Sequence, residues 1–319
     1  MHRRRMASGG LALAALLLSA ACSNDDTSGG DGDNTPAGGG DKGTISLSGQ
    51  NFTEMQIMAA MYQAVLEDAG YTVDVKLVDT RDVYVQQLKS GKVDVVPDYL
   101  AGMADFLNTA ANGVDATPIS SNSAEDTLSA LQPLADAAGI TMLEPAEATD
   151  QNAFAVTKDF ADENNLTTLS DLAALGEPVT LAAAPDCAGR SDCEGGLSDT
   201  YGINITKILP LGFDSPQTKD SVNQGESQLG LVATTDGALD EEGLVILQDD
   251  KGIQPAQNLI PAVNSDFLDA HPDVATALNE LSSTLTTEDL GALDLKVGVQ
   301  RAQPADVAME YLMDKGLMS

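Results

Sequence analysis

The chain has 319 residues, and its 49 acidic and 16 basic residues give it a formal net charge of −33 at pH 7. So acidic a surface repels nucleic-acid phosphates and anionic lipid headgroups, which argues against both as partners. The two histidines and three cysteines show no metal-site spacing, so we expect neither a metal nor a cofactor.

The first 21 residues have the pattern of a secretory signal peptide. Basic residues at 2–5 precede an apolar run at 11–21 that is too short to span a bilayer, and small residues lead up to Cys22. The segment resembles a bacterial lipobox, in which the cysteine becomes the first mature residue and carries a lipid. Ser19 stands where that pattern usually has Leu, and an ordinary secretory signal is the alternative.

The mature chain is expected to begin with a tether. Residues 22–42 are rich in Gly, Asp, Ser and Thr and nearly free of apolar side chains, which is typical of a flexible linker. About 275 residues follow, which is long for one hydrophobic core and suits two lobes.

Residues 43–148 alternate between strand and helix patterns. The expected order is β-α-β-α-β, with strands at 43–49, 72–78 and 93–96 and helices at 53–69 and 82–90. Asn51 or Thr53 is expected to cap the first helix. Because the connections are short, the pattern predicts a mostly parallel, doubly wound α/β sheet with flanking helices, which binds ligands at the carboxyl ends of its strands.

The same alternation repeats in residues 149–256, which we assign to a second lobe. Strands are expected at 154–156, 179–183, 205–209, 229–233 and 244–247, and helices at 169–175, 195–201 and 216–224. Residues 257–319 are expected to return to the first lobe, with a strand at 258–263 and helices at 274–281 and 304–315. Crossings near 147–152 and 254–258 would form a double-strand hinge, so that the lobes close over a ligand.

Cys187 and Cys193 are the two cysteines left for the folded part of the chain. Outside the cytosol two such cysteines usually pair, so we expect a small disulfide loop. Two free thiols or half a metal site are the alternatives.

Several segments resemble, in order along the chain, the glycine betaine, choline and carnitine binding proteins of osmoprotectant ABC importers. They are residues 49–54 (Gly-Gln-Asn-Phe-Thr-Glu), 88–94, 97–99 (Pro-Asp-Tyr), 155–159, 200–202, 234–237, 247–251 and 315–317. Each motif is weak alone, but the shared order is specific. The resemblance implies a type II periplasmic-binding-protein fold and a protein that hands a small molecule to permease subunits served by a cytoplasmic ATPase. We expect this protein to be a monomer that is lipid-anchored outside the bacterial cell membrane.

The resemblance also implies a site for a quaternary ammonium group. Such a group has no hydrogen-bond donor, and aromatic faces hold it by cation–π attraction of roughly 0.5–2 kcal/mol each. Tyr99 matches the cage tyrosine of the family, and Asp98 beside it is expected to face the cation or to orient groups of the pocket. Phe52, Gln50 and Asn51 follow the first strand and are expected at the same cleft. Packing roles for Tyr99 and Phe52 are the alternative.

Further ligand contacts are expected from the second lobe. Arg190 lies between the two cysteines and matches a family arginine, so we expect it to hold a ligand carboxylate; a solvated loop arginine is the alternative. Thr234, Thr235 and Asp236 end a strand at the cleft and are expected to bind the ligand. Ala233 stands where the family often has Tyr, and the chain has no Trp, so the aromatic cage is incomplete.

Other functions remain open from the sequence. The shortage of aromatic residues favours an amino acid or another small polar solute as the ligand of the same importer. A ligand-sensing domain without transport would use the same cleft. An enzyme is disfavoured, because the chain has no Gly-x-Ser-x-Gly elbow, phosphate loop or metal cluster.

Overall fold

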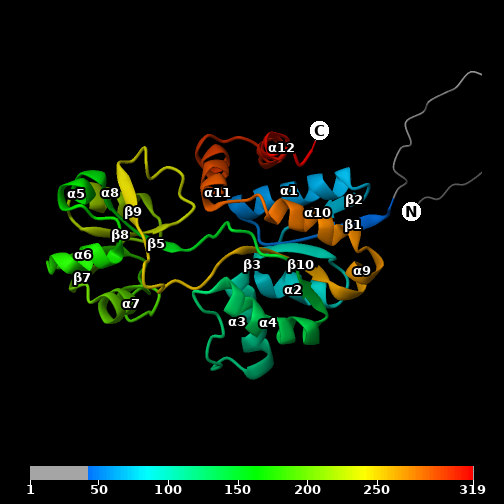
Figure 1. Cartoon of the computed structure of the whole chain (residues 1–319), viewed down its shortest axis with the longest axis horizontal. Helices are drawn as coiled ribbons and strands as arrows, with labels where there is room; N and C mark the ends of the chain where they lie inside the picture. Colours follow the sequence, from blue (N-terminus) through cyan, green and yellow to red (C-terminus); the bar gives the residue numbers. More distant parts are fainter. Residues whose placement is uncertain (1–41, 319) are drawn as a thin grey trace, which may run out of the picture. The chain divides into compact units, whose positions relative to one another are not determined.

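A computed structural model describes residues 42–318, which form two α/β lobes, each built on its own five-stranded sheet (Figure 1). The predicted signal peptide, Cys22 with its predicted lipid, and all of the predicted tether except Lys42 lie outside the described residues. Within residues 42–318, no helix combines the length and the apolar character needed to cross a bilayer.

The first sheet has the strand order β2-β1-β3-β10-β4. Its members are β1 (Thr44–Leu47), β2 (Thr72–Val75), β3 (Val95–Tyr99), β4 (Ile140–Met142) and β10 (Leu259–Asn264). β1 pairs in parallel with β2 and β3, whereas β10 pairs antiparallel with β3 and β4. The strand that runs against the others is therefore the one that arrives from the second lobe.

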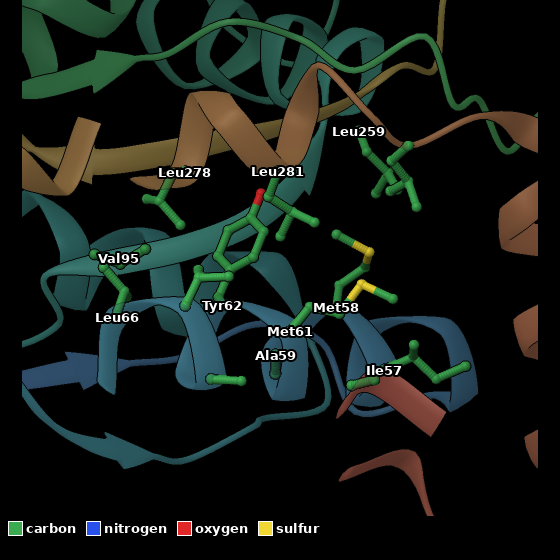
Figure 2. Packing of buried hydrophobic residues seen from close by; sticks show 14 of the residues in the cluster. Ile57, Met58, Ala59, Met61, Tyr62, Leu66, Val95, Leu259, Leu278 and Leu281 are labelled. Carbon is green, nitrogen blue, oxygen red and sulfur yellow. The ribbon is translucent and has the colours of Figure 1, made fainter. Parts of the chain in front are cut away.

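Helices cover both faces of the first sheet. They are α1 (Thr53–Asp68), α2 (Arg81–Lys89), α3 (Leu100–Asn112), α4 (Ala124–Ala138), α9 (Ser265–Ala270), α10 (Asp273–Ser282), α11 (Thr287–Asp294), the π-helix η2 (Leu295–Val299) and α12 (Pro304–Asp314). One apolar core joins α1, α10, α11 and α12 to the sheet, and a second joins α2, α3 and α4 to its other face. In Figure 2 the ring of Tyr62 points from α1 toward Leu281 of α10.

The second sheet repeats this topology with the order β7-β6-β8-β5-β9. Its strands are β5 (Asn152–Thr157), β6 (Val179–Ala183), β7 (Ile205–Pro210), β8 (Leu229–Ala233) and β9 (Leu244–Leu247). Its helices are α5 (Lys158–Asn164), α6 (Leu169–Leu175), α7 (Glu194–Gly196), the π-helix η1 (Leu197–Tyr201) and α8 (Pro216–Asn223). β5, which enters from the first lobe, runs antiparallel to both of its neighbours.

Two extended segments connect the lobes side by side. Thr149 and Asn258 form an isolated antiparallel bridge, and the amide of Asp150 donates to the carbonyl of Gln257 at 3.2 Å. The predicted two-lobe α/β fold, with mostly parallel strand directions and a double-strand hinge, is confirmed.

Two local predictions are wrong. Phe52, not Asn51 or Thr53, occupies the N-cap of α1 and gives no side-chain cap. The side-chain oxygen of Asn51 instead accepts a hydrogen bond from Gln56 at 2.9 Å. β3 also continues past its predicted end at residue 96 to Tyr99, because its Pro97 lies opposite Pro261 of β10, where neither missing N–H breaks the pairing.

Candidate functional site

A cavity of about 280 Å³ lies among segments that follow strands of both sheets. Phe52 and Glu54 reach it from the start of α1, and Asp150 reaches it from the first crossing segment. Thr235 and Asp236 follow β8, as expected for a cleft at the carboxyl ends of strands. The remaining lining residues are Thr53, Asp214, Ala233, Gly237, Ala238, Asp294, Leu295, Gly298 and Val299.

Glu54 is the most deeply buried acid of this cavity, with 3% of its surface exposed. It lies in the first turn of α1, on the same helical stripe as the buried side chains of Met58 and Met61. The hydroxyl of Tyr99 donates a hydrogen bond to its Oε1, whereas Oε2 is buried without a hydrogen-bond partner. Burial, followed by the charges of Asp150 and Asp294, raises the pKa of Glu54 well above its usual range.

The other acids of the cavity are perturbed in the same direction. Burial raises the pKa of Asp150, although the hydroxyl of Thr235 donates to its Oδ1 at 3.1 Å. Burial raises the pKa of Asp294 to about 7, helped by the charges of Asp150 and Asp236. Burial and the charge of Asp236 likewise raise the pKa of Asp214 to about 7. The cavity therefore disfavours the ionised form of several of its own carboxyl groups.

A lysine close to the cavity already has acidic partners. Lys219 Nζ lies 2.8 Å from Asp236 Oδ2 and 3.0 Å from Glu242 Oε2. Lys219 does not line the cavity, and no Lys, Arg or His is among its lining residues. Five carboxyl groups thus surround a space that contains no cationic side chain.

One aromatic ring is presented to the cavity. Phe52 is 39% exposed, and its ring is stacked near that of Tyr99, with centroids 6.4 Å apart and planes 13° apart. Tyr99 itself is buried and lies behind Glu54, outside the cavity lining. Ala233 lies on the wall where the resemblance leads one to expect a tyrosine, so that part of the cavity has no aromatic face.

Asp98 does not face the cavity, contrary to the prediction that it contacts the ligand. It is 1% exposed and accepts hydrogen bonds from Arg81 Nη2 at 2.9 Å and from the Tyr84 hydroxyl at 2.6 Å. The negative charge of Asp98 is therefore paired within the first lobe and is not available to a ligand. We interpret Asp98 as a positioning residue for β3, because its Oδ1 also accepts from the Tyr99 amide at 2.7 Å.

Three other residues predicted at the site lie beside the cavity. Gln50 pairs with Val78 in an isolated bridge, and Asn51 is exposed; neither lines the cavity. The hydroxyl of Thr234 accepts from the Gln151 amide at 2.9 Å and donates to the Thr149 carbonyl at 3.0 Å. Thr234 therefore fastens β8 to the first crossing segment, whereas its neighbours Thr235 and Asp236 reach the cavity.

Arg190 lies in a loop closed by a disulfide between Cys187 and Cys193. Its Nη1 lies 3.0 Å from Asp186 Oδ2, and its Nε donates to Asp192 Oδ1 at 2.9 Å. Arg190 lines a second cavity of about 270 Å³, which shares Asp150 with the first. The guanidinium predicted to hold a ligand carboxylate is thus already neutralised by two protein carboxylates.

Comparison with known proteins identifies the family. The family model described as "Substrate binding domain of ABC-type glycine betaine transport system" matches residues 43–314. The chain belongs to this family. It is therefore a binding protein of an ABC importer and not an enzyme.

The binding protein aligns with several named relatives over most of its length. A glycine-betaine-binding protein from Pseudomonas aeruginosa is 27% identical over 284 residues, which cover 86% of this chain and 89% of the relative. The carnitine transport binding protein OpuCC from Listeria monocytogenes is 26% identical over 279 residues, covering 86% and 88%. The solved structure of apo YehZ from Escherichia coli has a TM-score of 0.73 and 24% identity, covering 86% and 99%.

Sequence reasoning did not single out four acids of the cavity in the binding protein: Glu54, Asp150, Asp214 and Asp294. One signal was available for Glu54, because an acid on the apolar stripe of an amphipathic helix is unusual. No comparable signal marks Asp150 or Asp294, which lie 144 positions apart in a very acidic chain and meet only through the fold.

Proposed function

We propose that the binding protein captures a quaternary ammonium osmolyte of the glycine betaine or choline type in the cavity beside Glu54 and delivers it to the permease subunits of an ABC importer. The observation that carries this proposal is the cavity lining, which combines five carboxyl groups with the exposed ring of Phe52 and no cationic side chain. Family membership and the names of the relatives support the same class of ligand.

The physical reason lies in the chemistry of the cation. A trimethylammonium group spreads its charge over methyl groups and cannot donate a hydrogen bond, so it binds through nearby negative charge and aromatic faces. Phe52, backed by Tyr99, offers an aromatic face, and the carboxyl groups of Glu54, Asp150 and Asp294 offer the charge. Attraction between opposite charges strengthens where the cavity excludes water.

We further propose how the mature protein is organised. Residues 1–21 are removed, Cys22 carries a lipid outside the cell membrane, and residues 22–42 tether the folded part. Residues 43–148 and 257–319 form one lobe and residues 149–256 the other. A fatty-acid label that is incorporated into the wild-type protein and not into a Cys22→Ala variant would support the anchor, and equal labelling of both would refute it.

A ligand panel tests the function. The chain starting at residue 23 is melted with glycine betaine, choline, carnitine and common amino acids; a ligand at a hundredfold excess over its Kd adds about 2.7 kcal/mol to the stability of the folded state. We expect a quaternary ammonium compound to raise the melting temperature. A shift with an amino acid or another polar solute alone would refute the osmolyte as ligand and leave the importer role.

A further inference from the structure

Three carboxyl groups on different segments face one another in the cavity. We call Glu54 of α1, Asp150 of the first crossing and Asp294 at the end of α11 the carboxyl cluster. Glu54 is 97% buried, since only 3% of its surface is exposed, and its Oε2 has no hydrogen-bond partner. Asp294 Oδ1 is also buried without a partner. The pairing that remains open to these carboxyl groups is with each other, because Glu54 and Asp294 are close enough to share a proton in a hydrogen bond.

Among residues 42–318, no cationic side chain lines the cavity that contains the carboxyl cluster. The groups that face Glu54 are the hydroxyl of Tyr99 and the other two acids of the cluster. Around the rest of the cavity lie Asp236 and Asp214, and Lys219 is held by Asp236 and Glu242. A buried carboxylate without a counter-charge is costly, so the empty site requires positive charge from another source.

Protons are the source available to the empty protein. Burial and mutual repulsion raise the pKa of all three cluster members, that of Asp294 to about 7. An organic cation that enters the cavity then competes with the bound proton for the same carboxylates.

We propose that the carboxyl cluster makes the site select a cation that bears no carboxylate, and that the ligand's charge replaces a proton held by the cluster. This inference rests on the proposed function and narrows it to choline-like ligands. The exchange is balanced: the protonated cluster plus the cation gives the ionised cluster paired with the cation, and the proton passes to the buffer. Binding therefore strengthens as the pH rises.

A zwitterion such as glycine betaine is less suited to this cavity, because it carries a negative group as well as a positive one. The carboxylate of glycine betaine would add a negative group to a cavity that already has five acids. Arg190, the residue expected to receive that carboxylate, is already paired with Asp186 and Asp192, and it lines the adjoining cavity that meets this one at Asp150. The five-acid lining thus favours the hydroxyl end of choline over the carboxylate end of glycine betaine, because a hydroxyl can donate to a carboxylate oxygen, whereas a carboxylate cannot.

Calorimetric titration of the chain starting at residue 23 tests the inference. Choline chloride and glycine betaine are titrated at pH 6 and pH 8, each in two buffers that differ in ionisation enthalpy, which reveals the number of protons released. We expect choline binding to release close to one proton at pH 6. Below pH 7, the affinity for choline should increase by up to about tenfold for each unit by which the pH rises. At pH 8, choline should bind at least about tenfold more tightly than glycine betaine.

Matched variants locate the effect. Glu54→Gln keeps the size of the side chain and an acceptor for the Tyr99 hydroxyl but removes the charge, so we expect weaker choline binding and less proton release. Glu67→Gln makes the same change on an exposed turn of α1 and should alter neither. If Glu54→Gln fails to fold, Asp294→Asn serves as the second variant, and we again expect weaker choline binding and less proton release.

The outcomes separate the two proposals. Glycine betaine binding as tightly as choline, or choline binding without proton release, would overturn the inference and leave the osmolyte function intact. Failure of choline, glycine betaine and carnitine alike to bind the wild-type protein would overturn both.

Discussion

Asp294→Asn should stabilise the empty protein at alkaline pH and leave it unchanged at acid pH. The pKa of Asp294 rises from about 3.9 in an unfolded chain to about 7 in the folded protein. A carboxyl group with a raised pKa favours folding below its unfolded pKa, and this contribution is lost as the pH rises through the folded pKa. The pKa difference corresponds to about 4 kcal/mol at most at pH 8, and to about 2 kcal/mol once screening by water at this half-buried side chain is allowed for.

Asparagine has the shape of aspartate but no ionised form, so the stability of the variant should not fall as the pH rises through the pKa of Asp294. Urea unfolding at pH 4 and pH 8 measures the difference; we expect a gain of about 2 kcal/mol at pH 8 and little change at pH 4. Glu288→Gln, on an exposed position of the same helix, is the control and should change stability at neither pH. Equal destabilisation of Asp294→Asn at both pH values would refute the reasoning, because Asp294 would then make a stabilising contact that does not depend on its charge.

Three further changes test the surroundings of the cavity. Gly237→Ala should destabilise the protein by about 1–3 kcal/mol in urea unfolding, because the added Cβ would lie 2.3 Å from the carbonyl oxygen of Gly291; unchanged stability would show that α11 can move away. Replacing both Cys187 and Cys193 by Ser should lower the free energy of unfolding by about 2 kcal/mol, because both side chains are buried and the disulfide that closes their short loop is lost. An unchanged thermal midpoint would contradict this. Phe52→Ala should weaken binding of a quaternary ammonium ligand by about 0.5–1 kcal/mol in titration calorimetry, and unaltered affinity would exclude a cation–π contact there.

Periodicity in the sequence predicted many elements of this fold, but it missed α3, α4 and β4 and did not predict the antiparallel pairings. The helix at 169–175 and the strands at 179–183, 229–233 and 244–247 have the predicted bounds, because apolar spacing and flanking turn residues are local signals. The antiparallel direction of β5 and β10 depends on which lobe each strand comes from. That information lies in contacts between distant residues, which a local pattern does not contain.

Some residues of the site could be predicted from the sequence and others could not. Phe52, Thr235 and Asp236 lie on the cavity because each follows a strand that ends there, which a topological rule captures. Asp98 satisfies the same rule and is nevertheless turned away, since Arg81 and Tyr84 hold it inside the first lobe. Side-chain direction at a strand end depends on such partners, and the position in sequence does not reveal them.

The carboxyl cluster relates the stability of this protein to its proposed ligand. An aromatic cage attracts a cation through ring quadrupoles, which do not titrate, so its affinity is insensitive to pH. Carboxyl groups attract a cation more strongly when ionised, but they oppose folding while the site is empty. Asp294→Asn should therefore raise stability and lower affinity for a cation together, the trade-off expected of a binding site that is strained without its ligand. A variant that gains stability at pH 8 and keeps full affinity would show that the cluster's charge does not contribute to binding.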